Sequence, residues 1–330
     1  MIKQIQRASG LAISWWQAVA AVLMASALLP GTALAEEGGS GHYLPGSMAS
    51  FVDAVPLTEA FVLRLNALSY DGDIAKDLSI PIAGSTAAGV RAKSDALGLT
   101  ALWRPSWGGN GDWSYGMSAT VPYLRMDVSG SVASGPVSVQ RSDAVSGLGD
   151  LVLIPLMLNY KVNPDFNTEF RLVFYAPTGS YELGRLANTG KNFWTVEPTV
   201  AWRYFGQKNG IEATLFAGID YNRENAATQY KSGNQFHLDG TLAQHFPFAG
   251  GLSGAGLSGF YYQQLTGDSG AGASFGDFKA QTIGIGPVLS YVGKWGGNDI
   301  VAELKWLHET ETEKRLQGDT VFFKFIYRFF

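Results

Sequence analysis

The chain has 330 residues, no cysteine and a formal net charge of −4, with 28 acidic against 24 basic side chains. The absence of cysteine excludes disulfides, thiolate catalysis and thiolate metal sites, and the acidic balance argues against nucleic-acid binding, which needs a basic surface. The 41 glycines and the 19 Phe, 14 Tyr and 9 Trp residues suit a sheet-rich protein with many turns and with aromatic rings at an interface.

The first 35 residues have the three-part pattern of a secretory signal peptide. A basic N-terminal region precedes an apolar run at 18–29, and the sequence Ala-Leu-Ala at 33–35 forms a small-residue cleavage site. An uncleaved membrane anchor is disfavoured because the run is shorter than the ~20 residues that span a bilayer and because Pro30 follows it. We predict cleavage between Ala35 and Glu36, which removes two cations and no acid and changes the net charge from −4 to −6.

The remaining chain contains segments of about ten residues in which apolar and polar side chains alternate. In 112–127, for example, Trp113 and Tyr115 share one face, whereas Ser114 and Ser118 share the other. The segments with this pattern lie at roughly 57–70, 92–104, 112–127, 150–161, 167–177, 193–205, 211–221, 234–246, 256–266, 278–292, 300–311 and 319–330.

This pattern predicts an all-β fold, namely a transmembrane antiparallel up-and-down β-barrel of about 12 strands that occupies residues 57–330. After the signal peptide no segment is a candidate transmembrane helix, so residence in a membrane would require a closed barrel. Ten or fourteen strands also fit the pattern. A soluble β-sandwich would alternate as well, but it would not need so many uncharged faces of strand length.

The connections differ in length, which separates the two rims of the predicted barrel. Short connections fall at 106–110, 162–166, 206–210 and 293–299, and long ones at 71–91, 128–149, 178–192, 223–233 and 267–277. Since outer-membrane barrels have short periplasmic turns and long external loops, both termini are expected in the periplasm. Residues 36–56 precede the barrel and either trail in the periplasm or fold into the lumen as a small plug, and the sequence leaves both open.

The C-terminal segment 320–330 is the clearest membrane signal. Its odd-numbered positions from Val321 to Phe329 are apolar or aromatic, whereas Lys324 and Arg328 lie on the other face. A strand between lipid and a wet lumen needs this division. A terminal aromatic on such a strand is the assembly signal of bacterial outer-membrane barrels, which makes the barrel-assembly machinery an expected partner.

Charged side chains with inward parity are the candidate lumen-lining residues, and both signs are mixed among them. They either brace the lumen as ion pairs or select the solute that passes. We expect two ion clusters that constrict the pore: Glu169, Arg171, Glu197, Arg203 and Glu212 form the first, and Glu303, Lys305, Lys324 and Arg328 form the second. Arg64 and Asp239 complete the predicted lumen-lining set.

No catalytic residue, metal ligand or cofactor is predicted. An outer-membrane lipase would need Ser, His and an acid on the lipid-facing wall, and His308 is the histidine with outward parity, without a recognisable serine partner. His237 and His245 are eight residues apart along a strand, which separates them by roughly 27 Å and excludes a shared metal ion. The sequence therefore does not suggest an enzyme.

Several local strings resemble a known family. They are GGSGHYLPG at 38–46, GLGDL at 147–151, YAPTGSY at 175–181 and RLANTGKNFWTVEP at 185–198, with shorter matches at 230–237, 263–268 and 286–287. Together they resemble the outer-membrane proteins named for the meta-pathway of phenol degradation. The resemblance implies a barrel in the outer membrane and a role in the uptake of aromatic or other hydrophobic compounds. It names no substrate and no binding residue.

The strings also suggest an aromatic cluster at the outer rim. Tyr175, Tyr181 and Trp194 fall where the strands at 167–177 and 193–205 end. Such rings serve either as an interfacial girdle or as a first contact for a flat apolar solute.

The expected function is passive uptake of small hydrophobic, aromatic compounds across the outer membrane of a Gram-negative bacterium. A general small-solute porin and a closed structural or surface-interaction barrel are the alternatives. The expected surroundings are outer-membrane lipid and lipopolysaccharide. Substrate identity, the open or closed state of the pore and the oligomeric state do not follow from the sequence.

Overall fold

The computed structural model describes residues 41–74, 78–134, 137–273 and 279–330. The predicted signal peptide and the first residues of the segment 36–56 lie outside them. The strands are β1 (Ala60–Asp73), β2 (Ser79–Ile82), β3 (Ser85–Arg104), β4 (Gly109–Asn110), β5 (Trp113–Ser134), β6 (Val137–Leu148), β7 (Leu151–Asn163), β8 (Phe166–Ala176), β9 (Thr195–Phe205), β10 (Ile211–Asn222), β11 (Gln235–Phe248), β12 (Gly251–Gln264), β13 (Gln281–Trp295), β14 (Asn298–Glu313) and β15 (Gln317–Arg328).

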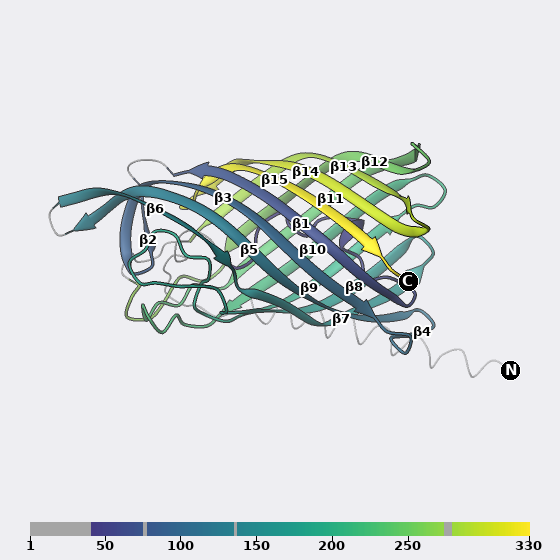
Figure 1. Cartoon of the computed structure of the whole chain (residues 1–330), viewed down its shortest axis with the longest axis horizontal. Coiled ribbons are helices and arrows are strands. Elements are labelled where there is room, and N and C mark those ends of the chain that lie inside the picture. The colour runs from purple at the N-terminus through teal and green to yellow at the C-terminus, as the bar shows by residue number, and fades with distance from the viewer. Residues whose placement is uncertain (1–40, 75–77, 135–136, 274–278) are drawn as a thin grey trace, which may run out of the picture. The chain divides into compact units, whose positions relative to one another are not determined.

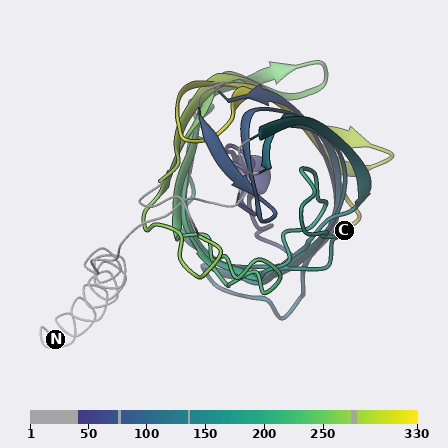
Figure 2. The same ribbon diagram turned by 90° about the vertical axis from the view of Figure 1, so that its left-hand side faces the viewer.

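Twelve of these strands close into one antiparallel barrel. The order around the ring is β1, β15, β14, β13, β12, β11, β10, β9, β8, β7, β5 and β3, and pairing of β3 with β1 completes it. The ring of strands is visible end-on in Figure 2 and from the side in Figure 1. The predicted twelve-stranded β-barrel is therefore confirmed. Within the described residues, no helix is long and apolar enough to cross a membrane.

Alternation along each strand separates an apolar outer face from a polar inner one. In β3, Leu97 and Leu99 are more than half exposed, whereas Thr100, the residue after Leu99, is buried. In β15, Val321 and Phe323 are exposed and Lys324 is buried. Leucines that a soluble protein would bury can remain on this surface because hydrocarbon, not water, meets them.

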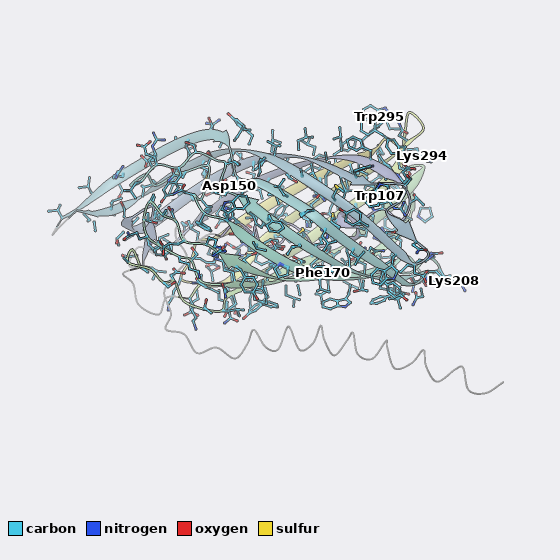
Figure 3. All side chains as sticks on the ribbon, turned by 90° about the horizontal axis from the view of Figure 1, so that it is seen from below. Trp107, Asp150, Phe170, Lys208, Lys294 and Trp295 are labelled. Atoms are coloured by element: carbon cyan, nitrogen blue, oxygen red, sulfur yellow. The ribbon has the colours of Figure 1, made fainter. Side chains whose placement is uncertain are left out.

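The turns at the two ends of the barrel differ. Short turns follow β3, β7, β9, β11 and β13, at the end where β1 begins and β15 finishes, which we call the turn end. Trp295 lies at this end and packs edge-on against Tyr327, which also contacts Phe329. At the same end Trp107 stacks on Tyr115. Figure 3 labels both tryptophans. These rings have the composition of an interfacial girdle. The opposite end, with longer connections, is the loop end.

Two predicted loops contain strands. Residues 128–149 are not a loop, because β5 continues to Ser134 and β6 returns alongside it, paired with β5. This hairpin extends far from the barrel at the loop end (Figure 1). Residues 71–91 include the end of β1, the start of β3 and β2, whose Ile80 and Ile82 are buried in an apolar cluster with Val90, Val128 and Leu186. In both segments, pairing to a neighbouring strand decides the conformation.

Candidate functional site: the barrel interior

Residues 41–56, which we call the luminal segment, run through the inside of the ring. The segment includes one short 3₁₀ turn, Phe51–Asp53, and Tyr43, Ser50 and Val55 are buried although they belong to no strand. Its hydrogen bonds reach inward side chains of β1, β8, β10, β11, β14 and β15, on opposite sides of the ring. Figure 2 shows the segment enclosed by the strands.

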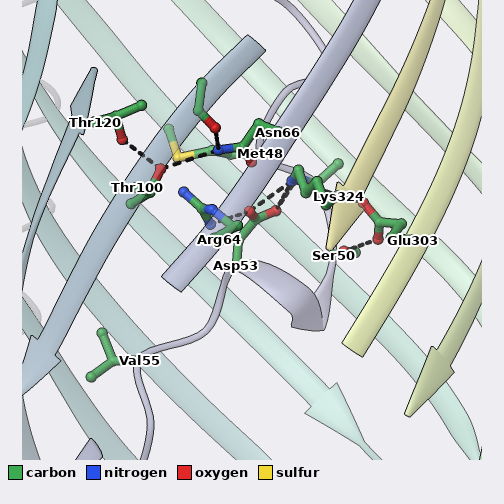
Figure 4. A network of polar contacts seen from close by, with 12 residues as sticks. Met48, Ser50, Asp53, Val55, Arg64, Asn66, Thr100, Thr120, Glu303 and Lys324 are labelled. Atoms are coloured by element: carbon green, nitrogen blue, oxygen red, sulfur yellow. Dashed lines mark hydrogen bonds and ion pairs between the residues drawn. The ribbon is translucent and has the colours of Figure 1, made fainter. Parts of the chain in front are cut away.

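Asp53 is the main link between the luminal segment and the wall. Lys324 Nζ lies 2.7 Å from both carboxylate oxygens, and Arg64 Nη1 lies 3.0 Å from one of them (Figure 4). Burial alone would raise the pKa of Asp53, but the charges of Lys324 and Arg64 outweigh burial and hold this pKa well below its usual range. The carboxylate is therefore ionised and fixed between two strands, β1 and β15.

A second link joins the segment to β14. Glu303 lies 3.5 Å from Lys305 and 3.8 Å from Lys324, and it accepts a hydrogen bond from the hydroxyl of Ser50. Lys305 Nζ donates to the carbonyl of Gly46 at 2.7 Å. The predicted second cluster is thus present in part. Arg328 does not belong to it, because its guanidinium binds Thr58, the Glu59 carbonyl and the Phe330 carbonyl at the turn end.

The predicted first cluster divides into separate groups. Glu169 pairs with Arg171 and with Arg203, whose Nη1 is 2.7 Å away. Arg171 also donates to the carbonyl of Asp53. Glu197 and Arg203 do not meet, which corrects the prediction. They are six residues apart on β9, a separation of roughly 20 Å along the strand.

The other two acids of that predicted cluster pair with histidines. His245 Nε2 lies 2.8 Å from Glu212, which also accepts from the backbone N–H of Phe51. His237 lies between Glu197, at 3.1 Å, and Asp239, at 2.7 Å. The alternation of the strands predicts that these side chains face inward, but it does not predict their positions along the barrel axis.

Asp239 holds the start of the luminal segment. One carboxylate oxygen accepts from the hydroxyl of Tyr43 at 2.8 Å, and the other accepts from the backbone N–H of Gly46 at 2.6 Å. The Tyr43 ring also stacks on the His237 imidazole with centroids 3.6 Å apart. The segment is therefore bound near both of its ends.

The three aromatic residues predicted at the outer rim lie in different surroundings. Tyr175 is buried, and its hydroxyl donates to Glu197 at 2.7 Å. Tyr181 is partly buried against the apolar cluster at the loop end, and Trp194 is largely exposed. A role of these rings in solute contact stays a prediction.

One polar contact at the loop end had no sequence signal. His42 Nε2 lies 3.0 Å from Asp150, and the imidazole stacks on Tyr175 at 5.1 Å between ring centroids. Burial lowers the pKa of His42, against the opposing effect of Asp150. Burial alone would raise the pKa of Asp150, but His42 and the backbone N–H groups of Gly179 and Lys191 together lower it. His42 carries no strand pattern, so periodicity could not place it.

A cavity of about 470 Å³ lies between the luminal segment and strands β1, β3, β5, β7, β8 and β15. Most of its lining side chains are apolar, for example Leu44, Met48, Val152, Val173 and Phe322. Asp53, Arg64 and Lys324 line it as well and supply a charged boundary. The volume falls within the range of about 300–1,000 Å³ that small-molecule sites occupy.

A closed antiparallel ring with an apolar outer face and a polar, charged interior defines the class of outer-membrane β-barrels. The chain belongs to the family described as "Putative MetA-pathway of phenol degradation", whose model matches residues 75–325. The family predicted from the short strings is therefore confirmed. No curated protein sequence matches the chain.

The chain is similar to solved structures at low sequence identity. The COG4313 outer membrane channel from Pseudomonas putida F1 is similar with a TM-score of 0.63 and 15% identity, over 84% of this chain and 97% of that chain. The β domain of the Bordetella autotransporter BrkA gives 0.45 and 12%, over 82% and 100% of the two chains. A mutant of the monoaromatic hydrocarbon channel TodX gives 0.42 and 11%, over 86% and 92%. The last two scores are too low to support any argument about this chain.

Proposed function

We propose that the protein is a passive channel for small hydrophobic, aromatic compounds that cross the outer membrane. The apolar cavity beside the luminal segment is the observation that carries the proposal. A wide aqueous pore would offer an apolar solute no favourable surface, whereas burial of such a solute in this cavity contributes about 25 cal/mol per Å² of apolar area.

The proposal assigns three parts to the chain. Residues 1–35 act as a signal peptide that is cleaved after Ala35, residues 36–56 act as a plug, and the strands act as the conduit. The contacts of Asp53 and Asp239 support the assignment of the plug. The proposed function is transport, not catalysis, and the final strand is the proposed contact of the barrel-assembly machinery. Outer-membrane lipid and lipopolysaccharide surround the barrel in this proposal.

Uptake measurements test the proposal. A deletion strain is complemented with the parent gene, and cells are assayed for uptake of labelled toluene and of a labelled sugar. Loss of toluene uptake alone in the deletion strain supports the proposal. Loss of both supports a general porin, and loss of neither supports a closed structural barrel.

A matched pair of variants links uptake to the cavity. Val173 is buried and lines the cavity, so Val173→Phe is expected to lower toluene uptake by filling it. Leu257 is largely exposed on the outer face, and Leu257→Phe is expected to leave uptake unchanged. Equal uptake in both variants would place the route outside this cavity.

A further inference from the structure

Three inward residues on neighbouring strands converge beside the luminal segment. Glu197 on β9, Asp220 on β10 and His237 on β11 are fully buried, and one ligand atom of each lies within 4.8 Å of the other two. Gly218 on β10 makes this convergence possible. A Cβ atom at this position would collide with His237 Nε2, so glycine lets the imidazole extend over β10 toward Glu197.

Both ring nitrogens of His237 face a carboxylate oxygen. Asp239 Oδ2 lies 2.7 Å from Nδ1, and carboxylate oxygens accept hydrogen bonds, so we take Nδ1 as the donor of that pair. The other nitrogen, Nε2, then faces Glu197 at 3.1 Å. A neutral imidazole in this orientation would direct a lone pair at a carboxylate. A cation between them, either a proton or a metal ion, removes the repulsion.

The surroundings match those of histidine–carboxylate metal centres. A metal-bound histidine usually donates its second N–H to a carboxylate, which Asp239 provides. Glu197 is oriented by two hydroxyl donors, Tyr175 at 2.7 Å and Thr199 at 2.5 Å. Ligands and supporting hydrogen bonds are thus both in place.

Charge favours a metal ion over a proton. Among the described residues, the ion pairs of Glu197 and of Asp239 are both with His237, so two carboxylates share one imidazole. By comparison, Glu169 in the same barrel forms ion pairs with two arginines. A divalent ion supplies more positive charge to the cluster than one proton does, and buried charge needs such compensation.

We propose that Glu197, Asp220 and His237 bind one divalent transition-metal ion of the zinc type. One imidazole nitrogen and two carboxylate oxygens form a ligand set that zinc accepts, with water in the fourth position, whereas calcium and magnesium prefer oxygen ligands alone. The ion would fix His237, and through it Asp239, which holds Tyr43 and Gly46 of the luminal segment. The proposal does not depend on which solute the channel carries.

Metal titration of the full barrel in detergent tests the site. Protein freed of metal with EDTA is titrated with Co²⁺, followed by visible absorption, and with Zn²⁺, followed by calorimetry. We expect saturable binding of one ion per chain and a higher thermal unfolding temperature with Zn²⁺ than with EDTA. Absence of saturable binding to the parent protein overturns the proposal, and this result requires no variant.

Variants locate the ion. Asp220→Asn and His237→Gln are expected to abolish one-to-one binding, and Asp239→Asn is expected to weaken it about 10- to 100-fold as a supporting residue. The matched control is His245→Gln, since His245 is a buried histidine of the same strand that pairs with one acid, Glu212, and it should leave binding unchanged. Unchanged binding in folded Asp220→Asn and His237→Gln would place the ion elsewhere and refute the assignment.

Discussion

The substitution Asp53→Asn tests how the luminal segment is held. The asparagine side chain keeps the shape of Asp53 and removes its charge, so Lys324 and Arg64 lose their partner. Breaking a buried ion pair by removing one partner costs about 3–5 kcal/mol. The Asp53 and Lys324 side chains are only 1% and 5% exposed, which makes this range applicable. Glu303, 3.8 Å from Lys324, compensates in part, so we expect the lower end, about 3 kcal/mol.

Unfolding by guanidinium in detergent, followed by tryptophan fluorescence, measures this cost. The matched control is Asp71→Asn, because Asp71 also pairs with two cations, Arg91 and Lys93, but is 46% exposed. Exposed ion pairs contribute about 0–1 kcal/mol to the free energy of unfolding, so Asp71→Asn is expected to cost no more than that. Single-channel recording of the same proteins should show larger conductance in Asp53→Asn, since the segment has lost its link to β1 and β15. Equal stability of Asp53→Asn and Asp71→Asn, with unchanged conductance, would refute this account of the interior.

Two further predictions concern the groups on either side of Asp53. Arg171→Ala and Arg203→Ala each remove one of the two cations that pair with Glu169, and both are expected to raise single-channel conductance. A large conductance that is the same in the parent and in both variants would indicate a wide porin instead. The His42–Asp150 pair is expected to weaken in acid. The folded-state pKa of His42 lies below its ordinary value of 6.5, so the unfolded chain binds the proton first and this stability is lost as the pH falls below about 6.5. Asp150 acts in the same direction at lower pH, because its folded-state pKa is also lowered. Unfolding midpoints of the parent and His42→Gln should differ more at pH 8 than at pH 5, and a larger difference at pH 5 would reverse the assigned sign.

The strands could be predicted because lipid imposes a strict rule on every second residue. Leu97 and Leu99 have to be apolar where they face hydrocarbon, and that requirement leaves the alternation visible in the sequence. The same rule does not apply to the β5–β6 hairpin. Both of its strands extend past the barrel, where small and polar residues such as Ser129, Gly130 and Ser131 satisfy either a loop or a strand.

The interior was predictable only in part. Alternation gave the inward face of Glu169, Arg203 and Lys324, but which residues meet depends on strand register and tilt, and these follow from the whole ring. Asp53 lies in a segment without periodicity, and its partner Lys324 is on the last strand, so no local pattern could join them. The histidine partners of Glu197 and Glu212 lie on another strand, so no local sequence pattern predicts those pairs either.

The pairing of β1 with β15 determines the order in which the molecule can assemble. Neighbouring strands from β7 to β15 can form as consecutive hairpins, but this last pairing joins the first and final strands of the ring and must wait for Phe322 and its neighbours. Strand pairings between residues far apart in the sequence form slowly, because closing the long loop costs entropy before the contacts of the pair stabilise it.

The luminal segment precedes β1 in the chain, yet its bonds end on Lys305 and Lys324 of the last two strands. Its final position therefore cannot form before those strands arrive, and seating of the segment coincides with closure of the wall. A chain stopped before β15 would lack both, and it would leave the edges of β1 and β14 open to aggregation.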